Sequence, residues 1–212
     1  MTPALQAAAR YRQWPNLYYY ARGKIALDPV YPFLARALRD STHHLLDLGC
    51  GMGLLEAFLR ANGYRAPVLG FDIDEKKIAI AQKVFADDQA RFCTADAINF
   101  PNHSGDVVML DVLHYFSNED QVRLLQKIAA SIAPEGVAFI RLALNEPTWR
   151  FAATKLEEWF VHFSRWIPLQ GWNFPTREEV VQPFRKQGLR CNISPMWGVT
   201  PFNSYLFTVR RT

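Results

Sequence analysis

Short apolar runs alternate along the chain with segments in which apolar residues recur at helical spacing. The runs predict strands, and the spaced segments predict helices. An alternation of this kind is typical of an α/β fold with a parallel sheet and right-handed crossovers. The expected strands are residues 45–48, 68–71, 90–93, 107–110 and 137–144, and the expected helices are residues 54–61, 75–85, 119–132 and 177–187.

Residues 190–193 and 205–210 predict two further strands. Two segments lie outside the alternation: a tyrosine-rich one near the N-terminus and an aromatic one after residue 145, where residues 152–167 predict an amphipathic helix. We expect a single domain over residues 1–212. Its parts are an N-terminal cap (1–43), a cofactor-binding core (44–145), an aromatic helical insertion (146–175) and a C-terminal helix with strands (176–212).

Composition narrows the class of protein. The 212 residues, 50% of them hydrophobic, suffice for one sizeable core. The net charge of +4 comes from scattered basic residues, so a nucleic-acid partner is not indicated. No uninterrupted apolar stretch would span a bilayer, and we expect a cytoplasmic protein. Cys50, Cys93 and Cys191 are odd in number and far apart, which favours reduced thiols over a disulfide framework.

The sequence D-L-G-C-G-M-G follows the first predicted strand and leads into the first predicted helix. Ligands of doubly wound folds bind at such turns, where Gly49, Gly51 and Gly53 permit positive φ and close backbone approach. A dinucleotide fingerprint would need a glycine at Leu54. Asp47 would repel a pyrophosphate but suits the ammonium and sulfonium of S-adenosylmethionine (SAM). The turn therefore favours SAM over a dinucleotide.

Two more carboxylates follow strands at the same expected edge of the sheet. Asp72 ends the second strand and suits ribose hydroxyls, as it would also in a dinucleotide-binding protein. Asp96 follows the third strand, where its carboxylate can accept from the amine of an adenine. Each aspartate alone is equally well explained as a strand-end or helix-cap residue. Together with Asp47 they favour an adenosine-containing ligand.

These motifs, together with G-D-V-V-M-L-D-V-L-H-Y-F, resemble those of class I SAM-dependent methyltransferases, and the resemblance runs from about Leu45 to Leu144. It implies a Rossmann-like, seven-stranded, mostly parallel sheet with helices on both faces and an antiparallel last strand. It also implies SAM as cofactor and S-adenosylhomocysteine (SAH) as product. The implied cofactor-binding residues are Asp47, Gly49, Cys50, Gly51, Gly53, Asp72, Ile73, Asp96, Ala97, Asp111 and Val112.

Methyl transfer needs an oriented acceptor and a dry site rather than a covalent intermediate. For a hydroxyl acceptor, His114 is the first candidate for a general base, and His162 is the second. The alternative for His114 is simple packing at the start of the next helix. Asn145 and Glu146 stand where metal-dependent relatives tend to have an Asp-Asn pair, so we expect no metal.

The acceptor is expected to be a small, largely apolar aromatic or acyl molecule, with O-methylation ahead of C-methylation. Aromatic residues of the insertion would wall its pocket, with Tyr20 from the N-terminal segment. The insertion helix has two alternatives: a cap on the core, or a surface for peripheral membrane contact or dimerisation. The expected substrate-binding residues are Tyr20, Trp159, Phe160, Phe163 and Trp166.

Three other functions remain open from the sequence. The first is a SAM-binding module without turnover, because the cofactor motifs require no catalytic residue beside them. The second is a dinucleotide-dependent oxidoreductase. The third is a nucleic-acid methyltransferase, which is less favoured because the segment after the fourth strand lacks the Asn/Asp-Pro-Pro-aromatic motif that grips a flipped base.

Overall fold

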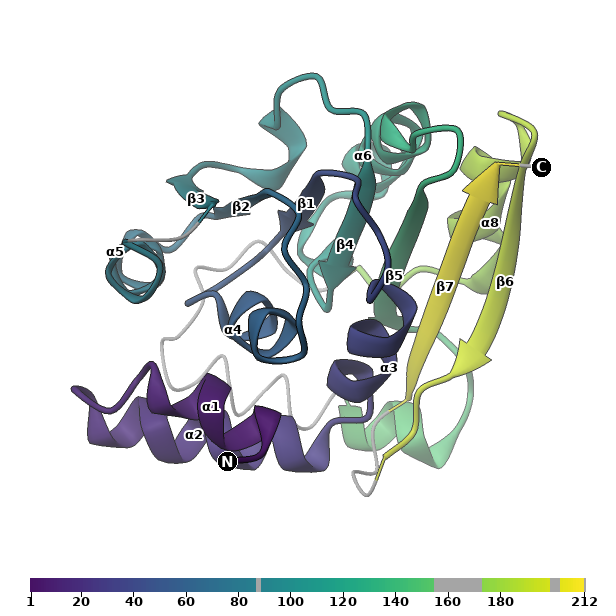
Figure 1. Cartoon of the computed structure of the whole chain (residues 1–212). Helices are drawn as coiled ribbons and strands as arrows, with labels where there is room; N and C mark the ends of the chain where they lie inside the picture. Colours follow the sequence, from purple (N-terminus) through teal and green to yellow (C-terminus); the bar gives the residue numbers. More distant parts are fainter. Residues whose placement is uncertain (87–88, 155–172, 199–202, 212) are drawn as a thin grey trace. The chain divides into compact units, whose positions relative to one another are not determined.

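The computed structural model describes residues 1–86, 89–154, 173–198 and 203–211 (Figure 1). The chain forms two compact units, Met1–Pro101 and Asn102–Thr212. The assignment of both to one domain stays a prediction.

The first unit contains a parallel sheet of three strands in the order β3-β2-β1. They are β1 (Leu45–Leu48), β2 (Val68–Asp72) and β3 (Ala90–Thr94). All four residues of β1 are buried, including Asp47. Leu48 pairs with Phe71, so the carboxyl ends of β1 and β2 meet at one edge. The glycine-rich turn after β1 and Asp72 at the end of β2 therefore lie at the same edge of the sheet.

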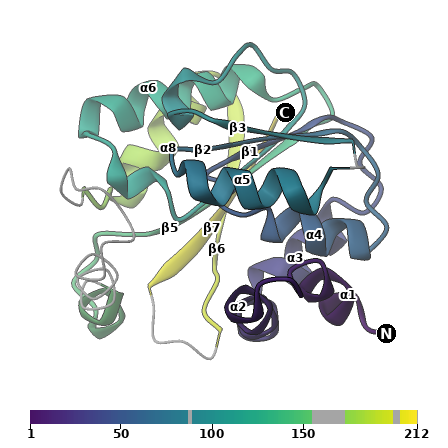
Figure 2. The same cartoon turned by 90° about the vertical axis from the view of Figure 1, so that its left-hand side faces the viewer.

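Two helices of this unit follow β1 and β2. Helix α4 (Leu54–Ala61) has the predicted bounds, and its residues from Leu54 to Arg60 are all buried. Helix α5 (Glu75–Val84) lies against β2 and β3, as Figure 2 shows. It ends one residue before the predicted end because Phe85 leaves the helical conformation, with φ −118° and ψ 25°.

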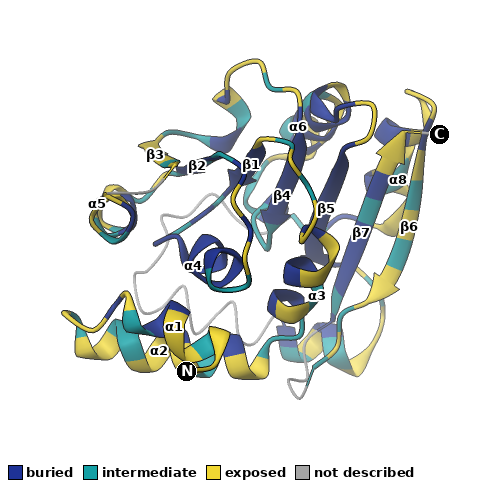
Figure 3. Ribbon diagram, in the orientation of Figure 1, coloured by how far each residue is buried: buried dark blue, intermediate teal, exposed yellow. Residues whose placement is uncertain are grey.

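The N-terminal cap consists of three helices, α1 (Pro3–Ala9), α2 (Pro15–Leu27) and α3 (Val30–Ala37). Proline at the first position of α1 and of α2 fits the fixed φ of that residue. Helix α1 packs against α2 and α4, and α3 also packs against α4. These contacts explain why α4 is buried almost all round, whereas the outward faces of α1 and α2 are exposed (Figure 3).

The second unit contains four strands in the order β4-β5-β7-β6. They are β4 (Asp106–Leu110), β5 (Val137–Ala143), β6 (Leu189–Pro195) and β7 (Ser204–Arg211). Strands β4 and β5 are parallel, and β7 is antiparallel to both β5 and β6. Figure 3 shows β5 buried along its length and the edge strand β6 largely exposed. Counted over the described residues, the two units supply the seven strands predicted, and the α/β fold class is confirmed.

Helices α6 (Asn118–Ser131) and α8 (Arg177–Arg185) pack against each other in the second unit. Helix α8 begins at a capping box formed by Thr176 and Glu179. It ends two residues before the predicted end, shortly before Gly188 with φ +73°. Two 3₁₀ turns were not predicted: η1 (Ala97–Asn99) in the first unit and η2 (Leu113–Tyr115) in the second.

The expected insertion helix is seen only at its start, because residues 149–154 are helical and residues 155–172 lie outside the described part. Among the helices that are described, none combines the length and the apolarity needed to cross a bilayer. A cytoplasmic location stays a prediction.

Candidate cofactor site

The glycine-rich turn after β1 has the backbone conformation that the sequence predicts. Gly49, Gly51 and Gly53 have φ values of +83°, +55° and +77°. The N–H groups of Gly49 and Cys50 both donate to the carbonyl of Phe71, at 2.7 and 3.0 Å, and this ties the turn to the end of β2. A Cβ on Gly51 would have no neighbour closer than 4.0 Å. The backbone at Gly51 is therefore open to approach by a ligand.

Asp72 is half-buried and joins this turn to the start of α5. Its Oδ2 accepts a hydrogen bond from the N–H of Gly51 at 2.8 Å, and its Oδ1 accepts one from the N–H of Asp74 at 2.9 Å. A carboxylate has about four acceptor positions, so Asp72 can still accept from two hydroxyl groups. The expected ribose-binding role of Asp72 is compatible with this geometry and stays a prediction.

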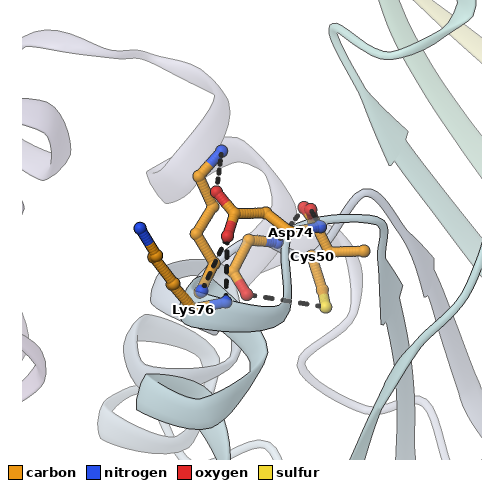
Figure 4. A network of polar contacts seen from close by, with 6 residues as sticks. Cys50, Asp74 and Lys76 are labelled. Atoms are coloured by element: carbon orange, nitrogen blue, oxygen red, sulfur yellow. Dashed lines mark hydrogen bonds and ion pairs between the residues drawn. The ribbon is translucent and has the colours of Figure 1, made fainter. Parts of the chain in front are cut away.

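Asp74, which sequence reasoning missed as a site residue, caps α5 next to Cys50 (Figure 4). Its Oδ1 accepts from the backbone N–H groups of Lys76 and Lys77, at 2.9 and 3.3 Å. The signal for it was an aspartate directly before a predicted helix. Ile73 is 63% exposed, an unusual position for an isoleucine, and it offers an apolar surface beside the Asp72 carboxylate.

A pair of buried carboxyl groups lies beneath the turn. Asp47 of β1 is 3% exposed and Glu56 of α4 is fully buried. The charge of Glu56 acts on Asp47, so the two carboxyl groups are neighbours. No nitrogen or hydroxyl group in the described residues donates to either oxygen of Glu56. Burial, and then the charge of Glu56, raise the pKa of Asp47 well above its usual range, and burial also raises the pKa of Glu56.

Sequence reasoning included Asp47 but missed Glu56. The signal was present in L-L-E-A-F-L, where a single carboxylate interrupts an otherwise apolar helix. Because Asp47 is so deeply buried, its contribution to a cofactor site would be electrostatic or made through a small opening. Its role as a cofactor-binding residue stays a prediction.

Tyr11, between α1 and α2, connects the N-terminal cap to the turn. Its hydroxyl is buried and donates to the carbonyl of Met52 at 3.0 Å. Burial, and secondly the charge of Glu56, raise the pKa of this phenol well above its usual range. Tyr11 therefore stays neutral and stabilises the turn through Met52. Nothing in the sequence distinguished Tyr11 from the tyrosines of α2.

Cys50 is buried within the turn. Burial raises the pKa of its thiol far above the usual range, so the side chain is a neutral thiol rather than a nucleophile. A Cβ on Gly70 of β2 would lie 2.8 Å from the Cys50 sulfur, so the glycine at that position makes room for the thiol. Cys50 thus serves to pack the turn, and any contact with a cofactor stays a prediction.

Asp96 and Ala97 follow β3, as the sequence indicates. The Oδ1 atom of Asp96 accepts from the N–H of Ile98 at 3.1 Å and caps η1. This is the capping alternative considered for an aspartate at a strand end. The remaining acceptor positions of the carboxylate are compatible with the expected adenine contact, which stays a prediction.

In the second unit, Asp111 directly follows β4 and has an unusual backbone conformation. Its φ is +57°, the one positive value among the described non-glycine residues. Its N–H donates to the carbonyl of Arg141 at 2.8 Å, and its carboxylate accepts from the guanidinium of the same residue at 2.5 Å. Arg141 is buried in β5 and was missed, although it is the one charged residue in V-A-F-I-R-L-A. Val112 follows Asp111 and is partly exposed.

His114 in η2 is 2% exposed and is surrounded by aromatic rings. Its imidazole stacks on Phe174, with centroids 5.1 Å apart and an interplanar angle of 16°, and lies 4.1 Å from the ring of Tyr115. Phe151 meets Phe174 edge-on at 5.2 Å. This environment matches the packing alternative for His114. Its role as a general base stays a prediction.

The remaining expected site residues are placed only in part. Tyr20 lies on α2 and is 47% exposed. Within the described ranges, no group of three or more histidine, cysteine, aspartate or glutamate side chains could hold a metal ion. The expected aromatic wall and the second base candidate lie outside the described residues; these are Trp159, Phe160, Phe163, Trp166 and His162.

Comparison with known proteins shows which class of enzyme this chain is similar to. A family model described as a methyltransferase domain matches residues 45–136. By sequence, the chain is similar to the demethylmenaquinone methyltransferase of Thermotoga maritima, with 25% identity over 175 residues that cover 76% of each chain.

Solved methyltransferase structures share the fold. The magnesium protoporphyrin IX methyltransferase of Synechocystis PCC 6803 with bound SAH has a TM-score of 0.64 and 21% identity, over 86% of this chain and 80% of that chain. The mitomycin 7-O-methyltransferase has a TM-score of 0.69 and 17% identity, over 100% of this chain and 61% of that chain. Because these identities are low, the likeness establishes the fold and leaves the acceptor open.

Proposed function

We propose that this chain, which is similar to methyltransferases in its sequence and in its fold, is a SAM-dependent methyltransferase that methylates a small, largely apolar acceptor with an aromatic ring. We further propose oxygen as the accepting atom ahead of carbon. SAM is the cofactor and SAH the product of enzymes of this class. The similarity to methyltransferases favours this function over a dinucleotide oxidoreductase and over a SAM-binding module without turnover.

The residues around the turn fit this cofactor. Gly51 leaves open backbone, Asp72 has unused acceptor positions, and the fully buried oxygens of Glu56 have no hydrogen-bond donor among the described residues. Such a site favours a ligand with hydroxyl groups and positive charge. The cofactor supplies a methyl group on a positively charged sulfur. The protein's part is to hold it, to orient the acceptor and to exclude water.

The observation that supports an aromatic acceptor is the stack of Phe151, Phe174 and His114 in the second unit. Phe151 lies near the start of the insertion and Phe174 near its end, so the two ends of the insertion meet beside η2. Since η2 directly follows Asp111 and Val112, apolar rings lie close to two predicted cofactor-binding residues. Flat apolar walls of this kind favour flat apolar ligands.

Hydrogen bonds fix this arrangement at the end of the insertion. The N–H of Asn173 donates to the carbonyl of His114 at 2.9 Å, and its side-chain amide donates to the carbonyl of Phe116 at 3.0 Å. Gln121 of α6 donates to the carbonyl of Asn173 at 2.6 Å. A rigid support of this kind is what an acceptor site needs to position its ligand.

For an acceptor that carries a hydroxyl group, we assign the removal of its proton to His114. The ring stacks on Phe174, and an imidazole is the side chain that most often acts as a general base. For a carbon acceptor, the same ring would serve only as a wall of the site. Methylation of a hydroxyl acceptor should therefore depend on the imidazole nitrogens, whereas methylation of a carbon acceptor should not.

The experiment is a methyl-transfer assay with SAM and three sets of acceptors: phenols and hydroxyquinones, fatty acids, and RNA or DNA. Mass spectrometry of the products would reveal the gain of one CH₂ group, and NMR would locate it on oxygen or carbon. We expect methylation of a phenol or hydroxyquinone. Methylation of only the fatty acids or only the nucleic acids would overturn the proposed acceptor class.

A further inference from the structure

The carboxyl pair formed by Asp47 and Glu56 connects the two elements that flank the glycine-rich turn. Asp47 belongs to β1, which enters the turn, and Glu56 belongs to the first turn of α4, which leaves it. Both side chains are removed from water, the charge of Glu56 acts on Asp47, and neither oxygen of Glu56 has a hydrogen-bond donor among the described residues. A buried carboxylate with no hydrogen-bond donor lowers the stability of the fold. Its presence beside the turn therefore suggests a functional role.

One negative and one positive side chain act on the pair, Asp72 and Arg60. Asp72 lies close enough to act on Asp47. The Cys50 thiol and the Tyr11 phenol face the same pair and stay neutral. Arg60, one turn further along α4, is the cation that acts on Glu56. Its guanidinium also donates to the carbonyls of Tyr64 and Ala66, at 3.2 and 2.9 Å.

Two ionised carboxylates cannot remain in contact in such surroundings, because their repulsion adds to the loss of hydration. A single proton held between them removes the repulsion and reduces the cost of lost hydration. The pair then titrates as a unit. A cation placed above the turn would have the opposite effect. It would stabilise the fully ionised pair and make the proton easier to lose.

We propose that Asp47 and Glu56 share one proton in the free protein and release it when SAM binds at the turn, so that the pair distinguishes SAM from SAH by charge. SAM carries a positively charged sulfur, whereas the sulfur of SAH is neutral. On release, the O–H bond of the shared carboxyl breaks and the proton passes to solvent. No covalent bond forms between the pair and the cofactor.

In this arrangement Glu56 is a positioning residue, because it acts through Asp47 and has no exposed surface of its own. The proposal rests on the assignment of SAM to the turn and not on the identity of the acceptor. It can be tested without any methyl transfer.

The test is isothermal titration calorimetry of the full chain with SAM and with SAH, in buffers of different ionisation enthalpy, from about pH 5.5 to about pH 7.5. An ordinary carboxyl is already ionised over this range, since its pKa is about 4. The number of protons released on binding is obtained from the change of the binding enthalpy with the ionisation enthalpy of the buffer. Wild type is compared with Glu56→Gln, which keeps a hydrogen-bonding amide, and with Glu135→Gln, an exposed carboxylate as the matched control.

We expect wild type and Glu135→Gln to release up to one proton on binding SAM and clearly fewer on binding SAH. The preference for SAM over SAH should rise with pH, by at most about tenfold per pH unit for one proton. Glu56→Gln should release no proton from the pair and should show a preference that does not change with pH.

Equal proton release with SAM and SAH in wild type would overturn the proposal, and this comparison needs no variant to fold. Proton release that is the same in Glu56→Gln as in wild type would also overturn it. Failure of the acceptor assay would leave both outcomes unchanged, so the proposed acceptor and the proposed proton are tested separately.

Discussion

The buried guanidinium of Arg141 lies 2.5 Å from the carboxylate of Asp111 and holds the one described non-glycine residue with a positive φ. The pair joins β5 to the segment after β4. A left-handed conformation costs an aspartate less than a bulky residue, because its short side chain can form local polar contacts. The conformation of a predicted cofactor-binding residue therefore depends on an arginine in the neighbouring strand.

Replacement of Arg141 by leucine should lower the free energy of unfolding by about 1–3 kcal/mol. The loss is smaller than for a fully buried ion pair because 40% of the Asp111 side chain is exposed. Chemical denaturation measures the change. The matched control is Arg123→Leu, which removes the exposed ion pair with Asp120 and should change stability by less than about 0.5 kcal/mol. Equal effects of the two variants would contradict the structural role of Arg141.

Tyr11→Phe should destabilise the protein by about 1–2 kcal/mol, because the buried carbonyl of Met52 loses its donor. It should also weaken SAM binding, because Met52 belongs to the turn. Tyr19→Phe, on the 66% exposed ring of α2, is the control and should alter neither property. Thermal unfolding and calorimetry would measure both. SAM affinity equal to that of wild type in Tyr11→Phe would show that the cap does not support the turn.

Gly53→Ala should be more damaging than Gly63→Ala. Both glycines have positive φ, +77° and +95°, so both variants carry the cost of that conformation, about 1–2 kcal/mol. Only at Gly53 would the new Cβ meet a side chain, the Phe85 ring at 2.9 Å, whereas Gly63 has open space. The difference in unfolding free energy isolates the packing cost. A larger loss in Gly63→Ala would show that packing at the turn is not tight.

The stability of the free protein should depend on pH through the Asp47 and Glu56 pair. Folding raises the pKa of both carboxyls, so their stabilising contribution is complete below the ordinary carboxyl pKa of about 4 and is lost as pH rises toward the folded values. Glu56→Gln should therefore match wild type near pH 4.5 and exceed it increasingly at higher pH. The limit is about 1.4 kcal/mol per pH unit for one proton. Denaturation curves over this range would measure the difference, and a constant difference would contradict the shared proton.

His114→Asn should lower kcat for a hydroxyl acceptor by about 10²–10⁴-fold and leave the affinity for SAM within a few-fold of wild type. Steady-state kinetics and calorimetry separate the two quantities. Phe174→Leu, which removes the stacked ring but keeps the imidazole, should raise the acceptor KM more than it lowers kcat. Unchanged turnover in His114→Asn would leave the ring with a packing role only.

Most of the fold could be predicted from the sequence because it depends on local patterns. The buried run of β1 and the amphipathic repeat of α4 have the predicted bounds. The glycines of the turn have the positive φ expected of them. Differences occur at element ends, such as the end of α8 near Gly188, where capping rather than periodicity decides the last residue.

The site residues that sequence reasoning missed are those whose partners come from distant parts of the chain. Tyr11 contacts Met52, and Arg141 contacts Asp111. The spacing of residues along the sequence indicates neither contact, because both depend on how helices and strands pack. Glu56 is recognisable in the sequence as a single carboxylate in an apolar helix. Only its burial beside Asp47 shows why that carboxylate matters.

The sequence by itself determined the class of the protein. Strand–helix periodicity, the glycine spacing and the acid after each strand follow from local backbone requirements and from the charge of the ligand. Only the tertiary structure decided which of these charges are exposed and which are paired. Burial and contact set the protonation of Asp47 and Glu56 and the conformation of Asp111, and both depend on residues that folding brings together from separate segments.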